Sequence, residues 1–404
     1  MTNSALDLFS AAPSSLGFFY QYRYALLLML EGVQRDPAIE VTIEKADDVT
    51  VGAGGKISSA VQTKKHQEGA KPLTDASKDL WSTLRVWCEG VGSGAFDLKA
   101  VKFVLVTTAG VAPTGLARLL RPDQDRDPDA ALGQLLRVAR TSQSEDNAKS
   151  YSCFLHMDEG VRRAMVHAIQ ILDRAPTTDD LDQRITRAVG FAVDPAHTPL
   201  FVRSLQARWL RRIEDHLAAP RGDVITGYEV HDWLRELRGQ YRPDNLPTEL
   251  EFEEPPESVW REAEEYTFVR QLRHIGLSDD QIAFAVRDYY QAFEQRGQWV
   301  REKLLHLQET ERYNLRLVDA WAREFAEAKR RLAASADPTE EVKSGVAIDL
   351  YQLIQRADYR IRPECSAPFV MRGSYQMLAD EPKIGWHPEW DRHFRGTRER
   401  RRAG

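Results

Sequence analysis

The sequence has few cysteines, no long apolar run and no excess of basic residues, and each absence excludes a class of protein. Cys88, Cys153 and Cys365 lie far apart and match no zinc-ligand spacing, so a disulfide framework is excluded and a reducing cytoplasm is the expected location. The longest apolar run, residues 24–30, is about a third of a bilayer span, and no secretory signal is recognisable, so no membrane partner is expected. The formal net charge of −6 excludes a histone-like coat for nucleic acid, so any DNA contact requires a local basic surface.

The motifs of several enzyme classes are also absent. Residues 52–56 (Gly-Ala-Gly-Gly-Lys) are similar to a phosphate-binding loop, but Thr50 stands where that motif requires glycine, and Ile57 where it requires serine or threonine. This segment is better interpreted as a hairpin turn between two strands. The sequence contains no dinucleotide fingerprint, no His-Glu-x-x-His helix and no Gly-x-Ser-x-Gly elbow. An ATPase or a serine hydrolase is therefore not expected.

Length and composition favour two domains. The chain has 404 residues, a length greater than one ordinary domain needs, and 42% of them are hydrophobic, enough for a sizeable core. Alternating and β-branched runs fall within residues 1–110, and helical periodicity dominates after them. The acidic, proline-bearing residues 250–257 are interpreted as a hinge, which predicts a first domain at 1–240 and a mainly helical second domain at 250–404.

The pattern within residues 1–110 predicts the order helix, three strands, helix, strand. These elements are a helix at 14–34, strands at 39–43, 49–51 and 57–63, a helix at 76–90 capped by Thr74 or Asp75, and a strand at 101–107. The later segments are expected to be helical and to end in an irregular tail. These helices are placed at 130–140, 159–172, 179–191, 199–217, 228–239, 258–274, 279–307 and 309–331.

Candidate catalytic residues lie at the hairpin of the first domain. Residues two apart on a strand share a face, so Gln62 and Lys64 point the same way, and Asp48 can lie beside them across the hairpin. The Asp48 carboxylate and the Gln62 amide oxygen suit Mg²⁺, which prefers oxygen ligands. The trio therefore suits metal-assisted phosphodiester hydrolysis, with Lys64 positioning or deprotonating the attacking water, or neutralising charge on the phosphate. Gln21, in the first helix, is a further candidate, either as an oxygen ligand or as a residue that orients the water.

The same residues also have a simpler interpretation. An Asp-Asp pair and a lysine-bearing strand are common on solvated hairpins, and the isolated pattern favours that interpretation. The order of elements, however, is that of the restriction-endonuclease-like core, which favours catalysis. Whether Asp47 or Asp48 faces the metal stays open, and Asp48 is preferred because it directly precedes the strand. Glu44 has the same strand parity as Asp48 and is interpreted either as an acid that supports the metal ligands or as a solvated strand residue.

Four segments within residues 14–110 carry a resemblance to a known family. They are 17–21 (Gly-Phe-Phe-Tyr-Gln), 44–49 (Glu-Lys-Ala-Asp-Asp-Val), 62–66 (Gln-Thr-Lys-Lys-His) and 73–81 (Leu-Thr-Asp-Ala-Ser-Lys-Asp-Leu-Trp). In this order they resemble the nuclease domain of the CBASS effector endonucleases, of the PD-(D/E)xK superfamily, which also occurs in Lamassu and related ABC-three-component anti-phage systems. The resemblance implies an α+β fold with a PD-(D/E)xK core, metal ligands at Asp48 and Gln62, and catalytic roles for Lys64 and Gln21. Gln62 stands where many members carry a second acid, and Glu44 or Asp47 is the candidate to compensate.

The second domain carries an independent resemblance. Its segments are 287–290 (Arg-Asp-Tyr-Tyr), 295–299 (Gln-Arg-Gly-Gln-Trp), 361–363 (Ile-Arg-Pro), 369–375 (Phe-Val-Met-Arg-Gly-Ser-Tyr) and 385–388 (Gly-Trp-His-Pro). They are similar to the C-terminal domain of ABC-three-component proteins. The two resemblances together indicate a Lamassu nuclease subunit and imply an endonuclease of double-stranded DNA that uses Mg²⁺, for which Mn²⁺ can substitute. They also imply an SMC- or Rad50-like ATPase partner, a small third subunit, and self-assembly into a homo-oligomer after release.

Candidate DNA contacts follow the second strand of the hairpin. They are Lys65, His66, Lys71 and Lys78. A mixed surface is the alternative for Lys71 and Lys78, and a loop position after the strand is the alternative for His66. Residues 1–110 include 11 basic and 12 acidic side chains, so a monomer is not expected to bind DNA tightly.

Aromatic residues and the basic tail give further hypotheses. Trp81 and Trp87 lie six apart, so one is expected in the core and the other at a partner surface. Trp386, His387 and Trp390 are interpreted as a packed aromatic cluster at an interface. The five arginines within 395–402 indicate either a solubilising end or a docking site for an acidic partner or DNA.

Two alternative functions stay open beside the defence nuclease. One is a nuclease gated by a cyclic oligonucleotide, as in CBASS effectors, and nucleotide binding by the purified chain separates it from the first. The other is a catalytically silent adaptor with a nuclease-like core, and mutation of Lys64 separates it from an enzyme.

Overall fold

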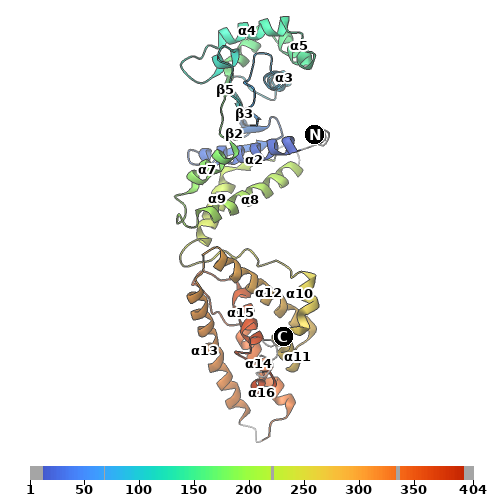
Figure 1. Ribbon diagram of the computed structural model, residues 1–404, viewed down its shortest axis with the longest axis vertical. Coiled ribbons are helices and arrows are strands. Elements are labelled where there is room, and N and C mark those ends of the chain that lie inside the picture. The colour runs from blue at the N-terminus through green and yellow to red at the C-terminus, as the bar shows by residue number, and fades with distance from the viewer. Residues whose placement is uncertain (1–11, 68, 220–222, 334–336, 395–404) are drawn as a thin grey trace, which may run out of the picture. The chain divides into compact units, whose positions relative to one another are not determined.

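The chain forms two compact units, residues 1–238 and 239–404 (Figure 1). The computed structural model describes residues 12–67, 69–219, 223–333 and 337–394. The arginine-rich tail lies outside these residues. In the part of the chain that is described, no helix is long and apolar enough to cross a membrane.

The acidic segment 250–257 lies inside the second unit. The backbone carbonyls of Glu251 and Glu253 accept hydrogen bonds from the Gln291 side chain at 3.1 and 2.9 Å. These bonds fasten the segment to a helix of its own unit, so the interpretation of this segment as a hinge is wrong. Its composition was misleading because carboxylates and prolines also suit an ordered surface segment whose backbone is bound by buried amides.

The first unit is built around a six-stranded mixed sheet with the strand order β5-β4-β3-β2-β1-β6. Its strands are β1 (Ile39–Ile43), β2 (Val49–Ala53), β3 (Lys56–Lys64), β4 (Lys102–Thr107), β5 (Ile169–Leu172) and β6 (Ile225–Thr226). The first three form an antiparallel meander, β4 and β5 run parallel to β3, and β6 pairs antiparallel with β1. Gly54 and Gly55 make the turn between β2 and β3 with φ values of 56° and 74°, a conformation that favours glycine.

Helices surround this sheet (Figure 1). They are α2 (Ala12–Val33), α3 (Lys78–Gly92), α4 (Pro128–Thr141), α5 (Ala148–His156), α6 (Glu159–Ala168), α7 (Thr178–Val189), α8 (Thr198–Ala218) and α9 (Gly227–Gln240), with the 3-10 helices η1 (Leu116–Leu120) and η2 (Glu145–Asn147). Helix α2 packs against β1, β2 and β3 through a buried stripe that includes Leu26 and Leu30. The helix, three strands, helix and strand predicted within residues 1–110 are therefore confirmed in that order.

The main apolar core of the first unit lies on the α3 side of the sheet. Phe103 of β4 and Ile169 of β5 are fully buried there, and the ring centroid of Trp87 lies 5.1 Å from that of Phe103. Ala60 of β3 belongs to the same core. Because alternate residues of a strand share a face, the side chains that follow Ala60 by two and four positions emerge on this side at the end of β3.

The second unit is helical. Its elements are α10 (Glu257–Glu262), η3 (Ala263–Glu265), α11 (Thr267–His274), α12 (Asp279–Arg301), α13 (Leu307–Leu332), α14 (Glu340–Gln355), α15 (Pro368–Asp380) and α16 (Trp390–Phe394). Helices α12 and α15 approach closely at Gly373, which has no side chain. A Cβ atom at this position would lie 1.9 Å from the carbonyl oxygen of Asp288. The α+β first unit and the mainly helical second unit agree with the coarser part of the predicted fold class, an α+β unit followed by a helical one.

Three sequence-based expectations for these elements are wrong. The helix expected at 159–172 ends at Ala168 and continues as β5, whose four residues are too short for a recognisable alternation. The helix expected at 258–274 is interrupted by η3. The tail expected to be irregular contains α14, α15 and α16, with Gly373 at a helix contact and Pro368 at the start of α15.

The cap of α3 also differs from expectation. The helix begins at Lys78, and the side chain of Ser77 caps it by accepting from the backbone N–H of Leu80 at 3.4 Å. Asp75, one of the two expected caps, instead accepts from the backbone N–H of Leu116 at 2.7 Å. It therefore holds the start of η1 beside α3.

Candidate active site

An acidic loop of five residues, Glu44 to Asp48, joins β1 to β2. Its ends are tied together, because the backbone N–H of Glu44 donates to the carbonyl oxygen of Asp48 at 3.1 Å. Glu44 has a φ of 55°, the left-handed conformation that non-glycine residues rarely adopt. Glu44 thus lies outside the strand, and the expectation that it shares strand parity with Asp48 is wrong. The loop places its last two residues, Asp47 and Asp48, at the start of β2.

Both aspartates of this loop contact the same side chain. Val49 pairs with Val61 in the β2–β3 ladder, so Asp48 lies opposite Gln62. The Gln62 side-chain Nε2 donates to Asp48 Oδ1 at 2.8 Å and also contacts Asp47 Oδ1. The second oxygen of Asp48 accepts from the backbone N–H of Thr63 at 2.9 Å. The hairpin therefore brings two carboxylates and one amide to a single point.

Lys64 completes the predicted trio. It follows Gln62 by two positions on β3, and its Nζ donates to Gln62 Oε1 at 3.2 Å. The amide of Gln62 is thereby oriented, with its nitrogen toward the two carboxylates and its oxygen toward the ammonium group. Across the site, the neutral amide therefore lies between the carboxylate pair and the ammonium group.

Trp87 of α3 fixes the position of Asp47. Its indole Nε1 donates to Asp47 Oδ2 at 2.8 Å, and the other oxygen of Asp47 accepts from the backbone N–H of Asp48 at 2.9 Å. Asp47 is only 5% exposed, and its burial raises the pKa of the carboxyl to about 6, although the hydrogen bonds from Gln62, Trp87 and Asp48 lower it. Trp81 and Trp87 are both fully buried, so the expectation that one of them meets a partner is wrong.

Gln21 reaches the acidic loop from α2. It is 3% exposed, and its Nε2 donates to Glu44 Oε1 at 3.0 Å and to the carbonyl oxygen of Asp48 at 2.6 Å. The bond to the Asp48 carbonyl shows how Gln21 holds the loop. Partial burial raises the pKa of Glu44, the bond from Gln21 lowers it, and the nearby Asp48 raises it further. The structure therefore brings all six predicted catalytic and secondary residues together around this loop. They are Gln21, Glu44, Asp47, Asp48, Gln62 and Lys64.

His216 is a residue that no sequence pattern singled out. It is fully buried at the end of α8, its Nδ1 lies 2.7 Å from Asp223 Oδ2, and its Nε2 lies 3.1 Å from the backbone nitrogen of Ile43. With the proton on Nδ1, the ring donates to Asp223 and accepts from Ile43. Lys45 adds a second tie to the same helix end, since its Nζ donates to the carbonyl oxygen of Ala219 at 2.9 Å. These contacts hold β1 and the acidic loop to α8.

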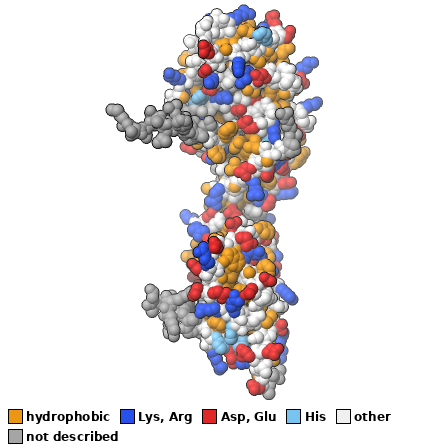
Figure 2. Space-filling view, turned by 90° about the vertical axis from the view of Figure 1, so that its right-hand side faces the viewer, with side chains coloured by type: hydrophobic (Ala, Val, Ile, Leu, Met, Phe, Trp, Pro, Cys, Tyr) orange, Lys and Arg blue, Asp and Glu red, His pale blue; other side chains and the backbone are white. Residues whose placement is uncertain are grey.

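The four candidate DNA contacts occupy different settings. His66 lies in the loop after β3, as the alternative interpretation expected, with its backbone N–H bonded to Thr108 and its Nε2 3.1 Å from Asp79 Oδ2. Lys78 is exposed at the start of α3 and lies 3.7 Å from Asp146. Lys71 is exposed and Lys65 is half-buried. On the face shown in Figure 2, basic and acidic side chains are interspersed over each unit, which agrees with the near-neutral charge count of residues 1–110.

The donor set fits a hard divalent cation. Gln62 Nε2 supplies the N–H donors that two adjacent carboxylates require, and half a turn of the amide would present its oxygen to the same place. Asp47, Asp48 and Gln62 would then offer only oxygen atoms, the ligands that Mg²⁺ prefers. Lys64 would then lose its bond to Gln62 Oε1, and its ammonium group would be available to a phosphate beside the cation. Such a group of residues is able to bind and orient a phosphodiester.

Comparison with known proteins gives a family match and several structural likenesses. Residues 268–394 match the family model of C-terminal domain 7 of the ABC-three-component (ABC-3C) systems. No curated protein matches the sequence. Among solved structures, the chain is similar to the Moraxella osloensis Cap4 SAVED/CARF-domain-containing receptor, at 12% identity and a TM-score of 0.36 over 64% of this chain and 60% of that chain.

A second likeness is to the Acinetobacter baumannii Cap4 SAVED/CARF-domain-containing receptor with the cyclic trinucleotide 3'3'3'-cAAA. It has 12% identity and a TM-score of 0.34, and it covers 62% of this chain and 56% of that chain. The chain thus spans less than two thirds of the length of these solved structures.

The aromatic cluster expected at an interface lies within the family match. Trp386, His387 and Trp390 are all buried, so their assignment to an interface is wrong. The domain at 268–394 supports membership of this chain in an ABC-three-component anti-phage system.

Proposed function

We propose that this chain is the nuclease of its defence system, a metal-dependent endonuclease of double-stranded DNA. The observation that carries the proposal is the contact of Gln62 with Asp47, Asp48 and Lys64. This arrangement gathers an acidic pair, an amide and an ammonium group at the end of one strand. A solvated hairpin has no physical reason to bury Asp47 at the cost of raising its pKa to about 6.

Each residue has a role that follows from its contacts. Asp47, Asp48 and Gln62 would hold Mg²⁺ or Mn²⁺, and the metal would supply polarisation of the scissile phosphate and a lower pKa for a bound water. Lys64 stabilises negative charge that develops on the phosphate, or orients the attacking water. Trp87 and Gln21 are positioning residues, because each donates a hydrogen bond to the acidic loop. Asp48 raises the pKa of Glu44 and Lys64 lowers it, so Glu44 belongs to the same group of charges.

The order of elements supports the same proposal. Helix α2, the meander β1 to β3, helix α3 and strand β4 follow the layout of the restriction-endonuclease-like core, to which the sequence resemblance also points. The C-terminal domain supports partner subunits, since ABC-three-component systems are multi-component. In line with that resemblance, the partners proposed are an SMC- or Rad50-like ATPase and a small third subunit. The active form proposed is a homo-oligomer, because the near-neutral nuclease core gives one copy little affinity for DNA.

Plasmid cleavage tests this proposal. The purified chain is incubated with supercoiled DNA and Mg²⁺ over a series of protein concentrations, against the same series with EDTA. Lys64→Ala is compared with Lys56→Ala, which removes an exposed lysine at the opposite end of the same strand. We expect cleavage that requires metal and Lys64, does not require Lys56, and rises more steeply than linearly with protein concentration.

The outcomes separate the alternatives. No cleavage, even with partner subunits and linear DNA present, would leave a silent adaptor. Cleavage that survives Lys64→Ala would show that Lys64 is not catalytic. Cleavage that requires an added cyclic oligonucleotide would indicate a nucleotide-gated effector. Calorimetry of nucleotide binding to the purified chain tests the nucleotide-gated effector independently.

A further inference from the structure

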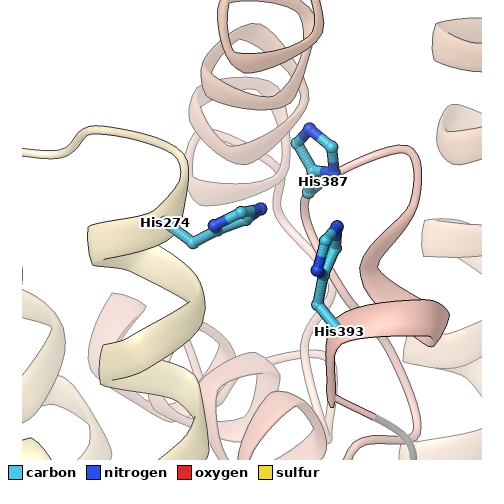
Figure 3. A group of neighbouring side chains, drawn as sticks. All are labelled: His274, His387 and His393. Carbon is cyan, nitrogen blue, oxygen red and sulfur yellow. The ribbon is translucent and has the colours of Figure 1, made fainter. Parts of the chain in front are cut away.

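Three histidines of the second unit, His274, His387 and His393, converge on one point. Each offers a ring nitrogen that lies within 4.8 Å of those of the other two. Ring centroids are 4.9 Å apart for His274 and His387, 4.7 Å for His274 and His393, and 5.8 Å for His387 and His393. Figure 3 shows the three rings turned toward a common space. No role in the proposed nuclease accounts for this trio.

The three rings come from three different elements. His274 is the last residue of α11, His387 lies in the loop that follows α15, and His393 lies in α16. The loop is held firmly, because Gln271 of α11 accepts from the backbone N–H of Trp386 at 3.3 Å, and Trp321 donates to the carbonyl oxygen of Gly385 at 3.0 Å. The position of the central ring is thus set by the core of the unit.

The hydrogen bonds of His387 determine which nitrogen carries a lone pair. His387 is 1% exposed, and its Nε2 lies 2.9 Å from Glu340 Oε1. Its Nδ1 accepts from the backbone N–H of Glu389 at 3.2 Å. The proton therefore sits on Nε2 and the lone pair on Nδ1. Glu340 thus lies beside the outer nitrogen without a formed hydrogen bond, and a carboxylate behind a histidine is the usual support of a metal-ligating imidazole.

We propose that His274, His387 and His393 form a binding site for a zinc ion in the C-terminal domain. Neutral imidazoles are ligands that zinc takes readily, at about 2 Å per bond, and three histidines leave a fourth position for water or a carboxylate. The imidazole set disfavours Mg²⁺, which prefers oxygen. Binding exchanges the weak bond from Glu389 to Nδ1 for a metal bond and draws the rings together.

The zinc ion would join the two ends of the domain. Helices α11 and α16 are the first and last helices of the matched segment 268–394. Helix α16 has five residues and buries only Trp390 among them, too little for a helix of that length to be stable alone. A metal that links His393 to His274 would hold α16 against α11 and so close the domain.

Zinc binding by the full-length protein tests the proposal. The protein carries no histidine tag, is stripped of metal by a chelator and dialysed, and is then titrated with Zn²⁺ against a colorimetric chelator. Asp48→Asn serves as the background, so that zinc at the nuclease site is not counted. We expect one zinc ion per chain, and at least tenfold weaker binding in His274→Ala and in His393→Ala. Both residues are exposed, so these variants should fold.

Matched variants separate a metal site from a general effect of losing a histidine. His306→Ala, which removes an exposed histidine at the start of α13, should leave affinity unchanged. Glu340→Gln should weaken binding by roughly 10- to 100-fold, the usual effect of losing a carboxylate behind a ligand. Cobalt(II) should give a visible absorption band that His393→Ala abolishes. Zinc binding that is indifferent to His274→Ala and His393→Ala, or no uptake at micromolar zinc, would overturn the proposal and leave the nuclease proposal untouched.

Discussion

The acidic loop of the first unit and the histidine trio of the second gather polar side chains in opposite ways. The acidic loop is bound internally, since Gln62, Trp87 and backbone N–H groups satisfy the carboxylates of Asp47 and Asp48. The trio has one internally bound ring, His387, and two exposed rings. One cluster offers oxygen ligands and the other nitrogen ligands. The two proposed sites would therefore select their cations by donor chemistry rather than by cavity size.

The largest effect expected to sharpen this comparison comes from Asp48→Asn. The substitution keeps the shape of the side chain and removes the charge that faces Gln62. Cleavage should fall by roughly 10³-fold, on the scale of losing one electrostatic stabiliser at a reacting centre. Zinc uptake by the second unit should not change. A variant that cuts DNA at more than a tenth of the parent rate would show that Asp48 does not hold the metal.

A glycine exchange tests the second cluster. A Cβ atom at Gly385 would lie 2.0 Å from Cγ of Trp390, so Gly385→Ala must displace α16 and its histidine. We expect the free energy of unfolding of the second unit to fall by about 1–3 kcal/mol, and zinc binding to weaken. Gly345→Ala in α14 is the matched control, because nothing lies near its Cβ position, and it should stabilise by about 0.5–1 kcal/mol. Equal zinc affinity in both variants would contradict the assigned position of α16.

A tryptophan pair on one helix tests the support of the acidic loop. Trp87→Phe removes the N–H that Asp47 accepts, and Trp81→Phe removes one that the backbone of Asp75 accepts. Both residues are fully buried, so the two variants lose similar packing. Trp87→Phe should raise the Mg²⁺ concentration required for half-maximal cleavage by roughly 10- to 100-fold, and Trp81→Phe should leave it unchanged. If the two variants need the same Mg²⁺ concentration, Trp87 has only a structural role.

The smallest expected effect concerns pH. Burial raises the pKa of Asp47 in the first unit and of Asp288 in the second, each to about 6. A carboxyl whose folded pKa is raised binds its proton more tightly when folded, so its contribution is present below pH 4 and is lost as pH rises through 6. Each unit should therefore lose roughly 2–3 kcal/mol between pH 4 and pH 7 in EDTA.

Metal should break the symmetry of that pH effect. Added Mg²⁺ should restore stability to the first unit above pH 6 and leave the second unit as it was, when unfolding is followed by calorimetry. Asp47→Asn and Asp288→Asn should each flatten the pH dependence of their own unit. A first unit whose transition ignores Mg²⁺ at pH 7 would argue against a metal at Asp47.

Sequence patterns predicted the parts of the site that depend on local geometry. Gln62 and Lys64 lie two apart on one strand, and Asp48 faces them across a short turn, so alternation and a glycine turn were sufficient. Trp87 contacts Asp47 across 40 residues of sequence, and His216 contacts Ile43 across 173. No periodicity records such pairs, because they depend on how helices pack on the sheet.

The same limit explains what was missed in the second unit. His274 lies far from His387 and His393 in sequence, and a single histidine carries no metal-ligand spacing. The aromatic neighbours of His387 correctly indicated packing, but they did not show that α11 and α16 meet. Strand β5 was missed for a similar reason, since its four residues become a strand through pairing with β4.

The bond between Trp87 and Asp47 gives the first unit a built-in optical reporter. Indole emission responds to the electric field around the ring, and the carboxylate that accepts from Trp87 belongs to the pair proposed to bind the metal. A cation that draws charge from Asp47 should change the fluorescence of Trp87 without any added dye. Stopped-flow emission could therefore follow the arrival of metal, and later of DNA, on the native protein in real time.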